Sequence, residues 1–438
     1  MLLVLPLLFA CGNDDDPVNG GGDKPSTDFD TSYDELIKVR TDVPLKAFYK
    51  DIFQDGGIHS SSYKDLPAAD MLGLSMEYLI TQSSDYIKED SVAQDRAFIG
   101  TPDDLNGYLL YPDGAPRFRM IFVNGGNASS HGESLGVEGR RNIKQFVHNG
   151  GSYIGSCAGA YVAAIGSDSA LYDEYIGIWP SRATNCHLSD SRTDMTIPED
   201  SPLLKYYDFG GDHYISSVYH NGGCCLDEKD RIRGTEVLTR YVYPYDPDKH
   251  NHMDGKGAAW AYKENELSGR CIMSGSHPER VTSGEIRDLM AAMIRYALDG
   301  QGNTTGKAIL HNGETRVMDK VADPAHAKIG DMQCHHFVTW IPEGAKDVKV
   351  TLTPKENFNF RLMMDHETFA YYEDADHIKE ESNGAPAELT FKNIEPGQWY
   401  IGVQCTSKPV AVAGKNGHTY AKTSLLNGVP YSISVSWK

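Results

Sequence analysis

Between residues 118 and 280, the sequence contains short apolar runs that each end in a cluster of small residues. Three of these runs are FRMIFVNGG, SYIGSCAG and GRCIMSGS, which begin at Phe118, Ser152 and Gly269. Apolar runs of this length are typical of strands in a parallel sheet, which is buried on both faces. Segments with helical spacing alternate with them, so the pattern predicts an α/β domain with a parallel sheet and helices on its faces.

The same periodicities give the expected positions of further elements in this domain. Helical spacing predicts three helices, over residues 64–80, 139–151 and 283–300. Ser283 is the expected N-cap of the last helix. Strand patterns predict three further strands, within residues 43–52, at 107–112 and at 257–262. The region 181–252 is rich in loop-forming residues, and its pattern indicates no clear element.

A polar, glycine-rich stretch, GQGNTTGK, interrupts the alternation at residues 300–307. The sequence beyond it contains short alternating runs separated by turns, namely KDVKVTLTP, FNFRLMM, AELTFKNI, GQWYIGVQC and YSISVSW. Such runs are typical of an all-β sandwich. We therefore predict three parts: a leader and tether over residues 1–40, an α/β domain over 41–304 and a β-sandwich over 305–438.

The charge and hydropathy of the chain restrict its partners. The formal net charge is −20, and an acidic chain repels phosphate backbones, so nucleic acid is not an expected partner. A membrane-spanning helix needs roughly 20 consecutive apolar residues, and the sequence contains no such run. Membrane contact is therefore expected only through a lipid anchor.

The first residues, MLLVLPLLFAC, resemble a bacterial lipoprotein signal in which Cys11 is lipidated and becomes the new N-terminus. The polar stretch GNDDDPVNGGGDKPSTDFDTS follows and is typical of a flexible tether. Its Asp14–Asp16 run resembles the surface-export signal of Bacteroidetes lipoproteins. The resemblance implies an outer-membrane lipoprotein of the bacterial cell envelope, surface-exposed or periplasmic. The alternative is a hydrophobic N-terminal strand.

The eight cysteines include Cys11, so an odd number remains after lipidation, which in an exported protein suggests a free functional thiol. Cys334 and Cys405 are the only two cysteines of the predicted sandwich, and export permits oxidation. We therefore expect a disulfide between them. No CxxC pair occurs, which argues against a structural zinc site.

Three fragments combine into a candidate catalytic site. They are FVNGGNA with Gly125 and Gly126, IGSCAGAY with Cys157, and CIMSGSHPE with His277 and Glu279. Each follows an expected strand, and ligands bind beyond the carboxyl ends of strands in open α/β sheets. A nucleophile on a tight strand-to-helix turn needs small neighbours.

These residue types supply the parts of a thiol-dependent acyl transfer. Cys157 is the expected nucleophile, His277 its base, and Glu279 the acid that orients the imidazole. The backbone N–H groups of Ala158 and of the Gly125–Gly126 turn could hold an oxyanion. The alternative reading of Cys157 is a small buried thiol in a tight turn, and that of Gly125–Gly126 is a turn alone.

The Gly-x-Cys-x-Gly elbow and the downstream His-x-Glu resemble the class I glutamine amidotransferase-like superfamily, closest to the biotin–protein ligase N-terminal-like domain. This resemblance implies a flavodoxin-like fold and the Cys157–His277–Glu279 triad. The sandwich resembles a bacterial pre-peptidase C-terminal domain, through Pro396-Gly397-Gln398-Trp399-Tyr400 and the final YSISVSW.

One departure from the superfamily argues against glutamine-dependent synthesis. Class I amidotransferases carry Gln four residues after the cysteine, where it helps to bind glutamine, and this chain has Tyr161 there. The small-residue elbow also resembles that of dipeptidase E and cyanophycinase, with Cys in place of Ser, which favours hydrolysis of an amide or peptide bond.

The expected function is therefore hydrolysis or transfer of an amide or peptide acyl group without ATP, metal or other cofactor. The expected partner is a small amide or peptide substrate, with Tyr161 among the substrate-binding residues. The alternative is a catalytically silent module that binds a ligand or a cell-surface polymer, or a main role of the sandwich in adhesion. His250 and His252 lie in a polar loop and only weakly suggest a metal site.

Overall fold

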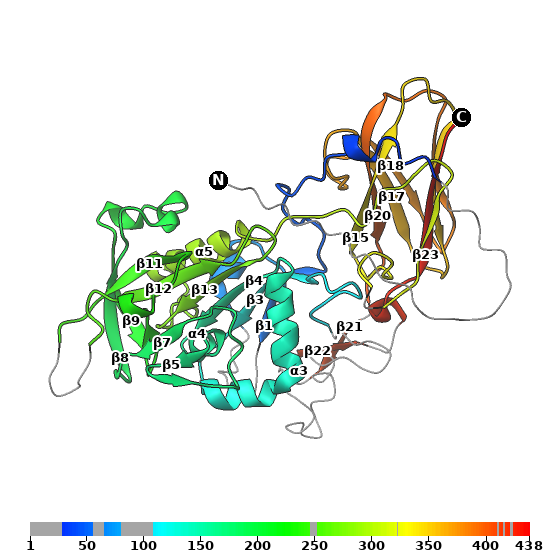
Figure 1. Ribbon diagram of the computed structural model, residues 1–438. Helices are drawn as coiled ribbons and strands as arrows, with labels where there is room; N and C mark the ends of the chain where they lie inside the picture. Colours follow the sequence, from blue (N-terminus) through cyan, green and yellow to red (C-terminus); the bar gives the residue numbers. More distant parts are fainter. Residues whose placement is uncertain are drawn as a thin grey trace.

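The computed structural model describes residues 29–55, 65–79, 108–245, 252–321, 323–409, 411–414, 417–420 and 424–438. An α/β part and a β-sandwich are seen in Figure 1. Within the described ranges, no helix is both long enough and apolar enough to cross a bilayer. The expected lipidation site, Cys11, and the acidic run behind it lie outside the described residues.

An eleven-stranded sheet forms the centre of the α/β part, in the order β21-β22-β2-β1-β3-β4-β13-β12-β11-β8-β9. Its parallel half consists of five strands: β2 (Met76–Leu79), β1 (Lys50–Asp55), β3 (Phe118–Val123), β4 (Ser152–Ser156) and β13 (Arg270–Ser274). Numbered along the chain, these strands run 2-1-3-4-5, which is the flavodoxin-like order. The predicted fold class is confirmed.

The antiparallel half of this sheet continues from β13 through four more strands: β12 (Gly257–Lys263), β11 (Thr235–Val242), β8 (Ser191–Thr196) and β9 (Tyr214–His220). Three of these strands come from the region 181–252, whose sequence indicated no clear element. The opposite edge carries the hairpin β21 (Ala411–Gly414) and β22 (Gly417–Tyr420), and β22 pairs with β2. A second, smaller sheet contains four strands: β10 (Cys224–Cys225), β7 (Arg182–Asn185), β5 (Gly166–Ser167) and β6 (Ala170–Leu171).

Helices cover both faces of the large sheet (Figure 1). Helices α1 (Pro67–Met71) and α5 (Gly284–Leu298) share one core with Ile52 and Met120. Helices α3 (Ala128–His148) and α4 (Ala158–Ala163) share the other core with Phe53 and Ile121. Adjacent residues of β1 and β3 thus face opposite cores, as strand geometry requires. The short 3₁₀ helices are η1 (Asp34–Leu36), η3 (Pro202–Lys205), η4 (Phe209–Gly211), η5 (Glu228–Asp230) and η6 (Ser424–Asn427).

Two of the expected elements are corrected by the structure. The helix expected over residues 64–80 ends at Met71, and Met76–Leu79 forms strand β2, because its backbone pairs in parallel with β1 from Ile52 onward. This tertiary pairing overrides the helical spacing of the side chains. Of the strand expected at 107–112, the described residues 108–112 form instead a turn with one isolated bridge, Leu110 to Pro116. Ser283 is the N-cap of α5, but its side chain makes no capping hydrogen bond.

The β-sandwich packs two four-stranded sheets around a separate apolar core. One sheet contains β14 (Thr315–Met318), β23 (Tyr431–Ser436), β16 (Val348–Pro354) and β19 (Ala387–Phe391). The other contains β15 (Cys334–Ile341), β20 (Gly397–Cys405), β17 (Phe360–Asp365) and β18 (His377–Glu381). Each of the five runs singled out in the sequence lies in one of these strands.

The structure contradicts the disulfide expected between Cys334 and Cys405, because the strand register points their side chains to opposite faces of the sheet. Cys334 on β15 stands directly opposite Gln404 on β20. Cys405 is the next residue along β20, so its side chain points to the other face of the sheet and packs in the sandwich core. The expectation was wrong because it rested on composition and could not include the strand register.

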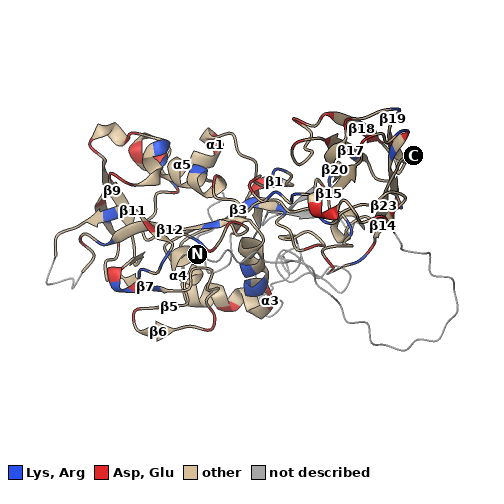
Figure 2. Ribbon diagram, turned by 45° about the horizontal axis from the view of Figure 1, so that its top comes forward, with Lys and Arg blue, Asp and Glu red and all other residues tan. Residues whose placement is uncertain are grey.

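Buried ion pairs join the sandwich to the α/β part, whose charged residues are coloured in Figure 2. Arg117 pairs with Asp331 at 2.8 Å, with both side chains buried. Asp113 pairs with Lys307, and the Tyr111 hydroxyl donates to the Asp331 carbonyl oxygen at 2.8 Å. Burial alone would raise the pKa of Asp113, but the Lys307 charge and His335 hold it well below its usual range.

Candidate active site

Cys157 lies at a strained elbow between β4 and α4. Its φ of 49° and ψ of −104° fall in a sparsely populated region, which costs on the order of 1–3 kcal/mol. The Cys157 N–H donates to the Ser274 carbonyl oxygen at 2.8 Å, and the Cys157 carbonyl accepts from Ala160 and Tyr161 at 3.0 Å each. The elbow is therefore fixed to the end of β13, which lies within the third sequence fragment.

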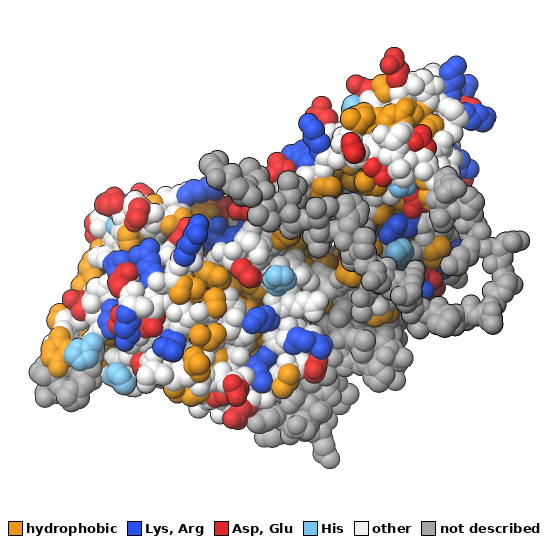
Figure 3. Space-filling view, viewed as in Figure 1, with side chains coloured by type: hydrophobic (Ala, Val, Ile, Leu, Met, Phe, Trp, Pro, Cys, Tyr) orange, Lys and Arg blue, Asp and Glu red, His pale blue; other side chains and the backbone are white. Residues whose placement is uncertain are grey.

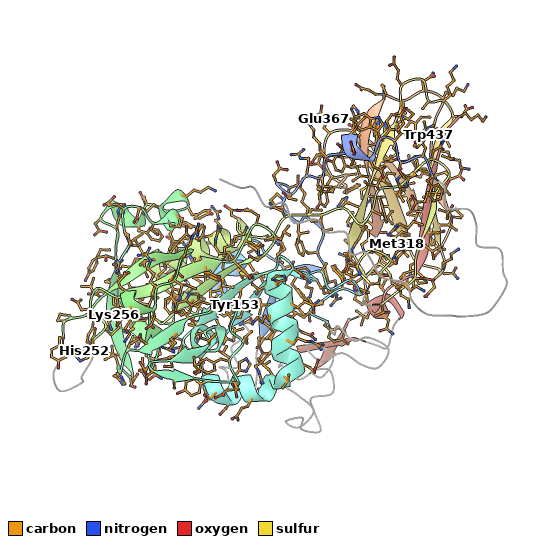
Figure 4. The ribbon with its side chains drawn as sticks, in the orientation of Figure 1. Tyr153, His252, Lys256, Met318, Glu367 and Trp437 are labelled. Atoms are coloured by element: carbon orange, nitrogen blue, oxygen red, sulfur yellow. The ribbon has the colours of Figure 1, made fainter. Side chains whose placement is uncertain are left out.

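The small residues around Cys157 are required by close backbone packing. A Cβ on Gly159 would lie 2.3 Å from the Val123 carbonyl oxygen, so α4 packs directly on the end of β3. The Tyr153 hydroxyl, labelled in Figure 4, donates to the Gly159 carbonyl oxygen at 2.7 Å. The elbow is therefore held from β3, β4 and β13, which leaves Cys157 little freedom to move.

His277 and Glu279 form a pair immediately after β13. The distance from His277 Nδ1 to Glu279 Oε1 is 2.9 Å, and Glu279 is only 3% exposed. Burial lowers the pKa of His277, but hydrogen bonds with Cys157 and Glu279 and their charges outweigh burial and raise it to about 10. Because Nδ1 faces the carboxylate, Nε2 is the ring nitrogen that remains to exchange a proton with the thiol.

Gly125 brings the first sequence fragment to the same point. A Cβ placed on Gly125 would lie 2.3 Å from His277 Cε1 and 3.1 Å from Cys157 Cβ. The three fragments therefore meet at one end of the parallel strands, and Gly126 lies next to Gly125 at the exposed surface. Ala158 begins α4, and the N–H groups of a first helical turn have no partner within their helix.

The region 181–252 covers the thiol. Cys157 is 5% exposed, and its Sγ donates to the carbonyl oxygen of Asn221 at 3.5 Å. Tyr161 is 8% exposed, and its hydroxyl donates to the Gly223 carbonyl oxygen at 3.2 Å. Tyr161 therefore holds the covering loop in place, and burial raises the pKa of its hydroxyl well above the usual value.

Three residues of the site, Tyr219, His220 and Asn221, were missed by the sequence reasoning. The backbone carbonyl oxygen of Tyr219 accepts from the backbone N–H of His277 at 2.8 Å, and the centroids of the two rings lie 5.7 Å apart. His220 Nδ1 lies 3.0 Å from Ser276 Oγ, and burial together with the His277 charge lowers its pKa to about 4. The stretch YHNGG, which ends a strand in two glycines as FVNGG does, was the available signal.

The other cysteines and histidines noted in the sequence lie outside this cluster or are inert within it. Cys271 packs in the core beneath the sheet, and burial raises the pKa of its thiol. His250 is not among the described residues, and the ring of His252 stacks on that of Tyr245 at 4.9 Å. Across the described ranges, no group of three or more His, Cys, Asp or Glu side chains is arranged to hold a metal ion.

Comparison with known proteins bears on both parts of the chain. Residues 115–183 match a family model described as "Biotin-protein ligase, N terminal". None of the curated proteins matches the sequence. Among solved structures, a glutamine amidotransferase is 13% identical over 57% of this chain and 97% of its own, with a TM-score of 0.34. PurLQS from Thermotoga maritima is 15% identical over 56% of this chain and 99% of its own, also with a TM-score of 0.34.

The sandwich has a separate structural neighbour. The pre-peptidase C-terminal domain of collagenase from Bacillus anthracis is 17% identical over 31% of this chain and all of its own, with a TM-score of 0.20. At these scores, the likenesses say nothing about activity. The family match covers the Gly125 turn, the Cys157 elbow and Tyr161, but it ends before His277. The sequence resemblance is confirmed over the matched residues: residues 115–183 match the biotin–protein ligase N-terminal family, and they lie within the α/β part of the chain.

Proposed function

We propose that the α/β domain hydrolyses or transfers the acyl group of an amide or peptide, with Cys157 as its nucleophile. The observation that carries this proposal is the contact of the strained Cys157 with His277, whose second nitrogen faces the buried Glu279 at 2.9 Å. A structural thiol needs neither a strained backbone nor a half-buried histidine held by a carboxylate. Perturbed pKa values and backbone strain cluster at functional sites, and both occur here.

In the proposed reaction, the thiolate of Cys157 attacks the carbonyl carbon, and a C–S bond forms. His277, protonated at neutral pH because of its raised pKa, gives a proton to the leaving amine as the C–N bond breaks. Water then attacks the thioester while His277 takes its proton, and the acid leaves as the C–S bond breaks. Glu279 keeps the ring oriented and stabilises the imidazolium.

The developing oxyanion would be held by backbone N–H groups. Ala158 directly follows the nucleophile, and the turn at Gly125 and Gly126 reaches the same end of the sheet. Removing one such donor typically costs two to three orders of magnitude in rate, or about 3 kcal/mol. Tyr161 does not bind substrate in this proposal, because its hydroxyl is engaged by Gly223.

A second candidate function, a silent module that binds a ligand or cell-surface polymer, is favoured by one observation. The thiol is 5% exposed and donates to the Asn221 carbonyl oxygen, so the resting site is covered. A hydrolase would have to displace this contact, whereas a binding module would keep it. Nucleic acid is not a proposed ligand of either, because the net charge is −20 and basic and acidic side chains are interspersed on the face in Figure 3.

The two functions are separated by a Cys157→Ala variant and a panel of amide and dipeptide substrates. We expect the wild type to cleave part of the panel with a thioester on Cys157, detected by intact-protein mass spectrometry. The variant should lose turnover by several orders of magnitude and keep its melting temperature, because alanine fits the elbow. Cys271→Ser, which changes a buried thiol outside the site, should keep its activity. If the wild type cleaves nothing and Cys157 reacts with iodoacetamide no faster than free cysteine, the silent module is favoured.

We also propose that the protein is an exported lipoprotein of the bacterial cell envelope, anchored through Cys11. This rests on the apolar leader before Cys11 and the acidic, glycine-rich stretch after it. The Cys11→Ser variant should move from the membrane fraction to the soluble fraction. Retention of that variant in membranes would contradict the proposal, and a Cys271→Ser variant serves as the control.

A further inference from the structure

Cys186 and Cys225, two cysteines outside the candidate triad, are neighbours across two strands of the small sheet. Strand β7 pairs with β10, so that Asn185 stands opposite Cys224 and Thr184 opposite Cys225. Cys186 directly follows β7, and its N–H donates to the Gly223 carbonyl oxygen at 3.1 Å. Cys225 lies two residues beyond Gly223, so Cys186 and Cys225 are diagonal neighbours on one face of this ladder.

The packing of the side chains separates the vicinal pair Cys224 and Cys225. Cys225 packs with Cys186 in the core that contains α1 and α5, and each of the two is 1% exposed. Cys224 packs in the other core, with α3 and α4. A hydrogen bond with the Cys225 side chain contributes to the raised pKa of Cys186, in agreement with the position of the two thiols as diagonal neighbours in one core.

We propose that Cys186 and Cys225 form a disulfide that fixes the covering loop over the candidate site. The segment it closes, residues 186–225, contains β8 and β9 and ends just after the Asn221–Gly223 loop that contacts Cys157 and Tyr161. The bond would join the start of this segment to its end. It would therefore restrict how far Asn221 and Gly223 can move from the thiol.

The oxidation needs a partner disulfide, such as glutathione disulfide or a thiol–disulfide oxidoreductase. One cysteine thiolate attacks the partner disulfide and expels a thiol, and the second cysteine then attacks the mixed disulfide. Together the two cysteines lose two electrons and two protons, and the partner disulfide becomes two thiols. Both sulfur atoms are inaccessible in the folded protein, and burial, together with the Cys225 hydrogen bond, raises the pKa of Cys186. The bond therefore forms during folding rather than by attack on the folded protein.

The test uses the full chain, refolded in a glutathione redox buffer and then denatured in iodoacetamide without reductant. Peptide mapping should recover a linked Cys186–Cys225 peptide, while Cys157, Cys224 and Cys271 are recovered alkylated. The oxidised protein should melt several degrees higher than the same protein refolded with dithiothreitol, because the unfolded chain is constrained. Hydrogen exchange in residues 214–223 should be slower in the oxidised form.

Two results would overturn the proposal. One is recovery of Cys186 and Cys225 as alkylated thiols after oxidative refolding, and the other is linkage of either to a different cysteine. The variants Cys186→Ser and Cys225→Ser should each remove the redox dependence of the melting temperature, while Cys271→Ser should keep it. The mapping on the wild type decides the question even if a serine variant fails to fold. The disulfide does not depend on the proposed hydrolase activity.

Discussion

The parallel and antiparallel halves of the large sheet each place one histidine near Cys157, and the pKa values of the two histidines are shifted in opposite directions. His277 follows β13 in the parallel half and has a pKa raised to about 10. His220 ends β9 in the antiparallel half and has a pKa lowered to about 4. Both rings lie in largely buried surroundings, so burial alone does not explain the difference.

The partners of the two rings account for it. His277 has the side chains of Cys157 and Glu279 as partners, and its hydrogen bonds and charge interactions with them stabilise the imidazolium. His220 contacts the hydroxyls of Ser276 and Tyr241, and the charge of His277 opposes its protonation. The histidine of the parallel half is therefore stabilised in its charged form at the site, whereas the histidine of the antiparallel half is stabilised in its neutral form.

Among the changes that test this comparison, the largest effect is expected from Gly125→Ala, which crowds His277 in the parallel half. The added methyl would lie 2.3 Å from His277 Cε1, so the ring must move away from Cys157. We expect the proposed activity to fall by at least about 100-fold, the order of loss seen when catalytic groups are misplaced by an ångström. Iodoacetamide labelling of Cys157 should slow in parallel.

Gly73→Ala is a matched control for this variant, because nothing lies within 4 Å of its added methyl. Alanine at this position is strained only through its backbone φ of 69°, which should lower the free energy of unfolding by on the order of 1 kcal/mol. Unchanged labelling of Cys157 in the Gly125→Ala variant would show that His277 does not set the reactivity of the thiol.

A smaller effect is expected in the pH dependence of stability, which should separate the two histidines. The folded pKa of His220 lies below its ordinary 6.5, so its contribution is present above pH 6.5 and is lost as the pH falls toward 4. The folded pKa of His277 lies above 6.5, so its contribution is present below pH 6.5 and is lost as the pH rises toward 10. Each ring adds a slope of at most about 1.4 kcal/mol per pH unit.

Urea unfolding of the His220→Asn and His277→Asn variants across pH 4–10 checks this difference. His220→Asn should flatten the acid limb of the stability profile, and His277→Asn should flatten the alkaline limb. The sandwich histidines His335 and His336 also have lowered pKa values, to about 4 and about 3, so part of the acid limb must persist in both variants. If both substitutions flatten the same limb, the pKa values of His220 and His277 are not shifted in opposite directions.

The smallest effect is expected from Tyr161→Phe, which tests the contact between the two halves. The change removes the hydroxyl that donates to Gly223 and should lower the free energy of unfolding by about 1 kcal/mol. The covering loop should open more often, so Cys157 should be labelled faster. Tyr153→Phe removes a similar buried hydroxyl, bonded to Gly159, and should cost stability without changing the labelling. Equal labelling in both variants would mean that Tyr161 does not hold the loop.

The parallel half was largely predictable from the sequence, because each of its site residues follows an apolar strand in a local motif. Cys157, His277 and Gly125 meet because the carboxyl ends of parallel strands share one edge of the sheet. The contact of Asn221 with Cys157 was not predictable, since it depends on the register of β8 and β9, which includes a bulge between Thr193 and Met195. Nor did the side-chain spacing of residues 64–80 reveal that Met76–Leu79 pairs with β1.

The buried pairs between the two parts of the chain have a consequence for how this protein can be divided. Arg117 and Asp113 belong to the α/β part, but their counter-ions, Asp331 and Lys307, belong to the sandwich. Removing one member of a buried pair typically costs about 3–5 kcal/mol, because the other charge is left without compensation. The sandwich thus supplies the oppositely charged partners of two buried side chains in the α/β part. A chain cut at the glycine-rich boundary would lose both ion pairs together.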